Sequence, residues 1–205
     1  MEKMKEAAEE ALKLLQDAES RRERAIRCSR DIIRETKKMI HSIHVSDDHD
    51  ASKENLGRLV SELRAWIGDD PLMKCISPAD DALAEYAEAM IFESVIRGDD
   101  IPSFTALGIG PGPWILGLAD CLGEMRRVVL ASLMSEDVQR AVSVFSDMED
   151  VFFTIMMFDV PDHVLPIRRK QDIARGIMER TRTDITNAVM ISKMRPARNL
   201  SGDDP

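Results

Sequence analysis

Residues 82–96, Ala-Leu-Ala-Glu-Tyr-Ala-Glu-Ala-Met-Ile-Phe-Glu-Ser-Val-Ile, decide how this chain folds. The stretch contains no proline or glycine, and its apolar residues surround the whole helical axis. A helix that is apolar all round is buried inside its protein. Two acids nevertheless stand within it, Glu85 and Glu88, and a spacing of three puts them on one face. We therefore expect a buried helix that carries a pair of carboxylates.

A second stretch, residues 114–134, has the same character. Trp114 and Val129 lie in its apolar flanks, and its middle holds Asp120 and Glu124, which are four apart and share a face. Burying ionised carboxylates costs free energy unless they are paired or metal-bound, and nearby like charges add to that cost. Carboxylate oxygens suit Mg²⁺, with Mn²⁺ as the alternative. The four acids predict two facing helices that hold one or two divalent cations.

Three other interpretations use similar acid pairs. The acids could lie on solvent-exposed helix edges and pair with surface lysine or arginine. A di-iron bundle needs Glu-x-x-His on two helices, but Ile91 and Arg127 occupy the histidine positions here, so the pattern fits it poorly. All-α nucleoside-triphosphate pyrophosphohydrolases usually carry Glu-x-x-Glu and then Glu-x-x-Asp. The second pair here is one residue longer, and this enzyme class stays open as an alternative.

Helical periodicity and turn residues predict an all-α fold, with no segment of strand-like alternation. We expect helices over residues 1–44, 53–67, 71–76, 77–98, 113–134, 136–158 and 167–194, with a helical turn near Ser103 in the 99–112 loop. This gives a single-domain bundle of six or seven helices over residues 1–194. The last residues, 195–205, are expected to form a flexible tail.

Composition narrows the function classes. The 205 residues are 32% charged and 44% hydrophobic, with a formal net charge of −9. No stretch approaches the roughly 20 apolar residues of a membrane span, so we expect no membrane association. The three cysteines match no zinc or redox spacing. Reduced thiols and the charged start of the chain favour a cytoplasmic protein.

Basic side chains are the candidates for nucleic-acid contacts, despite the acidic total. Arg30, Arg34 and Lys37 recur at spacings of four and three, so one helix face can present all three to RNA phosphates. The alternative is a solvated face balanced by neighbouring acids. Arg126 and Arg127 follow the second acid pair directly and are the further RNA-binding candidates.

Two acidic segments resemble a known family. Residues 85–89, Glu-Tyr-Ala-Glu-Ala, resemble the Glu-Tyr-x-Glu-Ala segment of Trax, and residues 117–124 resemble its Gly-x-Ala-Asp-x-x-Gly-Glu segment. Weaker similarity runs over roughly residues 20–190, through Ser29-Arg30-Asp31 and Leu165-Pro166. The chain therefore resembles the translin family, on its Trax-like, catalytic side. In its compactness, the chain resembles the prokaryotic, archaeal members of this family.

The resemblance implies a function and its residues. It implies a Mg²⁺-dependent endoribonuclease acting on single-stranded RNA, with single-stranded DNA as a second candidate ligand. Glu85, Glu88, Asp120 and Glu124 match the metal-binding, catalytic acids, and water is the nucleophile. It also implies a closed homo-oligomer, an octamer, and the apolar stretch 142–158 is consistent with an interface. The alternative within the family is a non-catalytic scaffold that binds RNA or single-stranded DNA.

Overall fold

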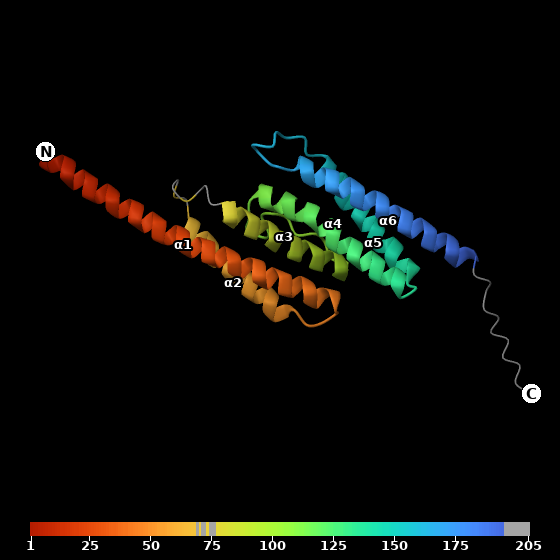
Figure 1. Ribbon diagram of the computed structural model, residues 1–205. Coiled ribbons are helices and arrows are strands. Elements are labelled where there is room, and N and C mark those ends of the chain that lie inside the picture. The colour runs from red at the N-terminus through yellow and green to blue at the C-terminus, as the bar shows by residue number, and fades with distance from the viewer. Residues whose placement is uncertain (69, 71–72, 74–76, 195–205) are drawn as a thin grey trace, which may run out of the picture. The chain divides into compact units, whose positions relative to one another are not determined.

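The computed structural model describes residues 1–68, 70, 73 and 77–194. These residues contain six α-helices and no strand, so the all-α prediction is confirmed (Figure 1). In chain order the helices are α1 (Glu2–His44), α2 (Asp50–Ile67), α3 (Ser77–Arg97), α4 (Pro111–Met134), α5 (Val138–Met156) and α6 (Arg168–Met194).

Helix boundaries differ from the predicted ones by at most three residues. Helix α4 begins at Pro111, because proline has no N–H to leave unsatisfied in a first turn. Helix α5 begins after Asp137, whose side chain accepts a hydrogen bond from the Arg140 backbone N–H at 2.9 Å. The predicted turn near Ser103 is confirmed, since the Leu107 N–H donates to the Ser103 carbonyl at 3.0 Å. The predicted tail lies outside the described residues, as does most of the predicted short helix 71–76.

The chain divides into two compact units, Met1–Cys121 and Leu122–Pro205, and the division falls within α4. The expectation of a single domain stays a prediction.

In the first unit, α1 packs against α2 and α3. Figure 1 shows α2 beside the second half of α1, whereas the first half runs past the end of α2. The contact face of α1 includes Ala25, Ile32 and Met39, all fully buried. The Cys28 thiol donates a hydrogen bond to the Leu59 carbonyl at 3.3 Å. Apolar burial and the Cys28–Leu59 hydrogen bond thus help to hold the α1–α2 hairpin together.

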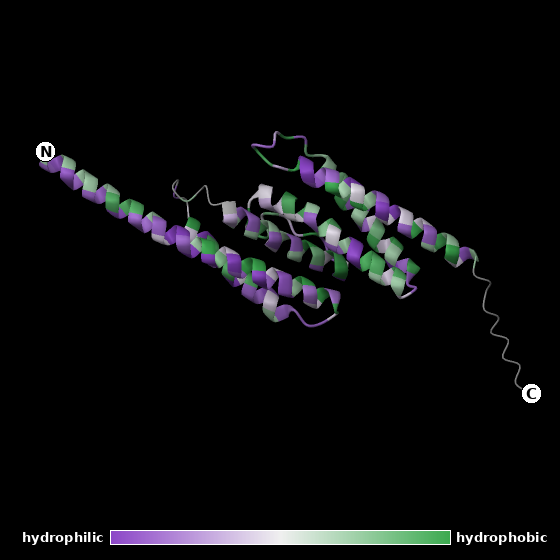
Figure 2. Ribbon diagram, viewed as in Figure 1, coloured by the Kyte–Doolittle hydropathy of each residue, from purple (hydrophilic) through white to green (hydrophobic). Residues whose placement is uncertain are grey.

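Helix α3 is buried on all sides in its middle, as its sequence predicts. Its fully buried side chains, Ala82, Ala87, Ala89, Ile91 and Phe92, point in different directions around the axis. Figure 2 colours the helices by hydropathy and shows both hydrophobic and hydrophilic residues along α1 and α3.

In the second unit, α5 packs against α6. The Gln171 side chain donates from Nε2 to the carbonyls of Ile155 and Phe158, both at 2.9 Å. Ile155 is in the last turn of α5 and Phe158 follows two residues after its end, in the region where helical carbonyls lose their backbone partners. The Gln171 side chain of α6 therefore provides hydrogen-bond donors for carbonyls at and just after the end of α5. Within the described part of the chain, no helix has the length and hydropathy of a membrane span.

Candidate active site

Helices α3 and α4 touch at Gly117. A Cβ on Gly117 would lie 2.5 Å from the carbonyl oxygen of Ala84, 2.7 Å from the Cβ of Ala87 and 2.8 Å from the backbone nitrogen of Glu88. Real Cβ atoms do not approach backbone so closely, so glycine is required for this helix contact. The glycine of the second acidic segment thus lies against the backbone of the first.

Three of the four predicted acids flank this contact within the first unit. Glu85 and Glu88 are on α3 at the level of Gly117, and Asp120 follows Gly117 by three residues on α4. All three side chains are half-buried. The structure therefore places Glu85, Glu88 and Asp120 on adjoining helix backbones within the first unit.

Glu124 is one helical turn beyond Asp120 on α4 and belongs to the second unit. Its carboxylate is half-buried and accepts a 2.8 Å hydrogen bond from the Arg127 guanidinium. Glu124 is therefore paired with a basic neighbour. A pair three residues apart on a helix is worth only a few tenths of a kcal/mol, roughly 0.2–0.5, so another cation can compete with Arg127.

The donor chemistry of the acids fits Mg²⁺. Among the described residues, no three histidine, cysteine or carboxylate side chains form a ready-made metal-binding group. Mg²⁺ does not need one, because it keeps several waters and binds through one or two carboxylates plus substrate phosphates. Carboxylate pairs such as Glu85 with Glu88, or Asp120 with Glu124, have the oxygen donors that such a ligand set requires. The metal site itself stays a prediction.

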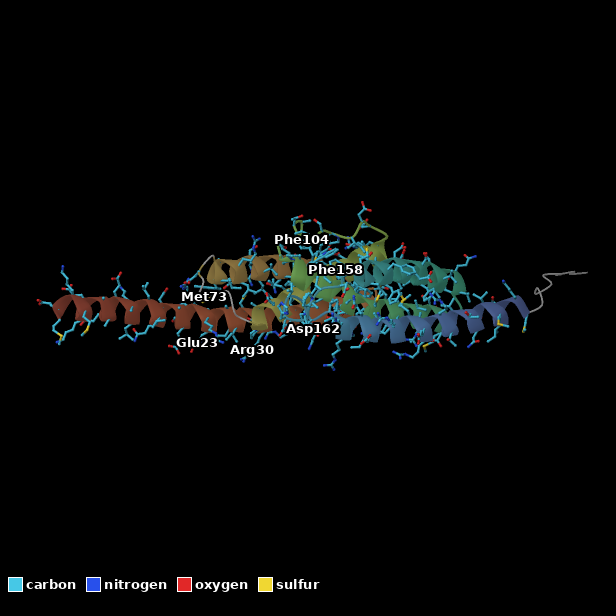
Figure 3. All side chains as sticks on the ribbon, turned by 90° about the horizontal axis from the view of Figure 1, so that it is seen from above. Glu23, Arg30, Met73, Phe104, Phe158 and Asp162 are labelled. Carbon is cyan, nitrogen blue, oxygen red and sulfur yellow. The ribbon has the colours of Figure 1, made fainter. Side chains whose placement is uncertain are left out.

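The predicted RNA-binding residues of α1 are exposed. Arg30, Arg34 and Lys37 all face solvent, and Figure 3 shows Arg30 on the outer side of the helix. Arg34 donates to Asp31 at 2.8 Å. An exposed ion pair of this kind contributes about 0–1 kcal/mol, so a phosphate group can replace the acid. The three side chains are accessible to RNA, and their role in binding stays a prediction.

Arg126 has a structural role within the second unit. Its guanidinium donates to the Thr181 hydroxyl at 2.7 Å and to the Asp184 carboxylate at 2.8 Å, and the side chain is half-buried. These contacts tie the end of α4 to α6. Arg127 is exposed beside Glu124. Contact of either arginine with RNA stays a prediction.

Sequence reasoning missed the most buried acid described in the structure, Glu93 on α3. Its side chain is only 3% exposed and accepts from Lys53 Nζ at 2.7 Å, Arg97 at 3.0 Å and His49 Nε2 at 3.1 Å. Arg97, one turn later on the same helix, is the sequence signal that could have revealed a paired acid. Lys53 and His49 come from the start of α2 and become partners only through folding.

His49 bridges two acceptors. Its Nδ1 lies 3.2 Å from the Asp47 carbonyl oxygen, and its Nε2 lies 3.1 Å from a Glu93 carboxylate oxygen. A neutral imidazole has one N–H and can donate to only one of them, whereas the doubly protonated ring donates to both. The cluster of Glu93, His49, Lys53 and Arg97 therefore joins the α1–α2 connection to the end of α3.

These features define a class: an all-α protein in which two adjoining helices each carry a pair of half-buried carboxylates. No protein-family model matches the chain. The uncharacterized protein MJ0175 of Methanocaldococcus jannaschii is 34% identical over 182 residues, which cover 88% of this chain and 82% of that protein.

Solved structures extend the comparison to the whole fold. AfC3PO in complex with duplex RNA superposes with a TM-score of 0.83 at 27% identity, covering 92% of this chain and 100% of that one. AfC3PO alone gives 0.81 at 28% identity, with 90% and 98% covered. Apo-NeC3PO gives 0.78 at 22% identity, with 88% and 96% covered, and shows the shared fold. C3PO structures are translin–Trax structures. The chain belongs to the translin family.

Proposed function

We propose that this protein is a Mg²⁺-dependent endoribonuclease of the Trax-like branch, acting on single-stranded RNA. The observation that carries the proposal is the α3–α4 contact at Gly117, which places Glu85, Glu88 and Asp120 on adjoining backbones. A protein that only binds RNA gains nothing from half-buried acids, because they repel phosphate. Acids that hold a cation serve phosphodiester cleavage instead.

The roles of the residues follow from their chemistry. Glu85, Glu88, Asp120 and Glu124 hold the cation, and their half-buried positions strengthen that interaction relative to open water. Bound Mg²⁺, or Mn²⁺ in its place, supplies an activated water and offsets negative charge on the phosphate. The basic face of α1, made of Arg30, Arg34 and Lys37, holds the RNA backbone. Arg127 can add positive charge near Glu124 once the cation takes over that carboxylate.

The comparison with AfC3PO supports RNA as the ligand class, because that protein was solved with duplex RNA at 27% identity to this chain. Exposed arginines and lysine contact backbone phosphates in single strands and duplexes alike. Single-stranded RNA is the proposed cleavage substrate, because a flexible strand can bend to bring a backbone phosphate to the half-buried acids.

We also propose that the protein forms a closed homo-oligomer, an octamer. The apolar stretch 142–158 leaves Phe153 at 62% and Met157 at 80% exposure. Large apolar side chains exposed together on one element are typical of an interface. Light scattering should show an assembly of about eight chains, and a stable monomer at micromolar concentration would contradict this part of the proposal.

The function is tested with end-labelled RNA of one sequence, presented as a single strand and as a duplex. Cleavage of the single strand is expected with Mg²⁺ or Mn²⁺ and none with a chelator. Single-stranded DNA and a panel of nucleoside triphosphates are run beside it. Release of pyrophosphate from the nucleotides, with RNA left intact, would identify the pyrophosphohydrolase alternative. Binding of RNA without cleavage under all metal conditions would identify the non-catalytic scaffold.

A further inference from the structure

The first 17 residues of the chain form a helical arm that packs on nothing in the described molecule. Every residue from 1 to 17 is exposed, although residues 2–17 continue α1 without a break. Leu12, Leu14 and Leu15 are 56–61% exposed, and Met4 is 62% exposed. An isolated helix of this length is marginal in water, and the three exposed leucines add an unfavourable apolar surface.

The arm continues the buried stripe of α1 in register. Ala18, Ala25, Ile32 and Met39, seven residues apart, form the spine that packs inside the first unit. Seven-residue steps stay on one helix face, with a drift of about 20° each. Two further steps backwards reach Ala11 and Met4. Leu14 and Leu15 stand two such steps before Cys28 and Ser29, which are buried, with the half-buried Arg21 and the exposed Arg22 at the positions between them.

The arm therefore exposes to solvent apolar side chains of the kind that are buried further along α1. We propose that a second copy of this chain covers it, with the two arms packed side by side in antiparallel orientation. The proposal rests on the self-association proposed above and names the surface through which two chains associate.

Side-chain size favours the antiparallel orientation. The beginning of the arm carries small residues, Ala7 and Ala8, and its end carries the three leucines. With Lys3 of one arm opposite Asp17 of the other, antiparallel pairing sets Leu12 opposite Ala8. It sets Leu14 and Leu15 opposite Glu6 and Lys5, whose aliphatic stems can cover them. Parallel pairing would set leucine against leucine at one end and leave alanine against alanine at the other.

Charge favours the same orientation. Residues 2–5 carry Lys3 and Lys5 with a single acid, whereas residues 16–20 carry Asp17 and Glu19 and no base. Antiparallel pairing brings the basic beginning of one arm to the acidic end of the other, and parallel pairing would bring like charges together. Asp17 contacts Arg21 at 3.1 Å but keeps a 67% exposed side chain, so it can still reach a partner.

The first experiment measures assembly mass by light scattering for Leu14→Glu and Leu15→Glu. Both side chains are exposed in the single chain, so the helical circular dichroism and melting temperature of the first unit should stay near those of the parent. A two-fold interface lost from a symmetric assembly should lower the mass about twofold. Gln16→Glu, on the polar side of the arm, adds the same charge and should leave the mass unchanged. Parent mass in both leucine variants would overturn the proposal.

The second experiment tests orientation by disulfide trapping. Lys3→Cys protein is mixed with Asp17→Cys protein and oxidised, and the linked peptides are identified by mass spectrometry. Antiparallel arms predict the mixed cross-link and little of either self-link. Dominant self-links would show parallel arms, and a mass drop in the leucine variants without any arm–arm link would place the arm on another surface; either result overturns the proposal. RNA cleavage is measured on the same samples: failure of the parent protein to cut RNA, with mass and cross-links as expected, counts against the nuclease alone.

Discussion

Lys53 Nζ lies 2.7 Å from Oε2 of Glu93, and this contact joins the first turn of α2 to the last turn of α3. Glu93→Gln keeps the shape of the side chain but removes the charge that Lys53, Arg97 and His49 share. Because Lys53 and Arg97 are partly exposed, they regain water, and the loss should be smaller than for a fully buried pair. We expect about 2–3 kcal/mol of unfolding free energy to be lost in urea denaturation.

The control for this change is Glu62→Gln on α2. Glu62 pairs with Arg58 at 3.3 Å, and both side chains are exposed. A surface pair of this kind contributes about 0–1 kcal/mol. Equal losses for the two variants would show that the Glu93 cluster does not hold the helices together.

The contact of Gly117 with α3 predicts a strong size effect. Gly117→Ala puts a Cβ against backbone atoms that cannot move aside, so overpacking should cost about 1–3 kcal/mol. Gly123→Ala is the matched change on the same helix, where a Cβ would meet no heavy atom of the described residues within 4 Å. That variant should gain roughly 0.5–1 kcal/mol from helix propensity. Opposite signs in thermal or urea unfolding are expected, and a stabilised Gly117→Ala protein would rule out the close α3–α4 contact.

Cys28 should make stability depend on pH in the alkaline range. Burial raises the pKa of this thiol to about 11 from an ordinary value of 9.0. The unfolded chain then loses the thiol proton before the folded chain does, so this contribution is complete below pH 9 and is lost as pH rises from about 9 to 11. Cys28→Ala removes that contribution. Unfolding free energies of both proteins between pH 8 and pH 11 should converge as pH rises, whereas a constant difference would mean that the thiol does not titrate differently on folding.

Measurements of RNA binding and melting temperature should distinguish the role of the exposed basic face of α1 from the role of Arg126. Replacing Arg30, Arg34 and Lys37 by glutamine should weaken RNA binding, lower its salt dependence and leave the melting temperature nearly unchanged, because these side chains are exposed. Arg126→Gln should instead lower the melting temperature, because it removes two hydrogen bonds to α6. Filter binding at several salt concentrations, with melting curves for each variant, distinguishes the two effects. An unchanged salt dependence in the α1 variant would place the RNA elsewhere.

Much of the fold could be predicted from sequence because helical periodicity is local. The apolar stretch 82–96 identified a buried helix. Proline and glycine marked the end of α2, both ends of α3 and the starts of α4 and α6. The acid pairs were visible because carboxylates in an apolar helix are unusual. Glu93 was not recognised, because its partners Lys53 and His49 are more than 35 residues away in the chain. The structural role of Arg126 likewise depends on Thr181, which only the packing of α6 brings near.

The most direct test of the central claim is cleavage of single-stranded RNA in Mg²⁺ by Glu88→Gln and Asp120→Asn, beside Asp81→Asn as an exposed acid at the start of α3. Loss of either ligand should lower the rate by about a hundredfold or more while RNA binding stays near that of the parent. The products of the parent protein should carry 5′-phosphate and 3′-hydroxyl ends, as attack by water requires. Parent-like rates in folded Glu88→Gln and Asp120→Asn proteins, or products ending in 2′,3′-cyclic phosphate, would contradict a catalytic site built on the acids of α3 and α4.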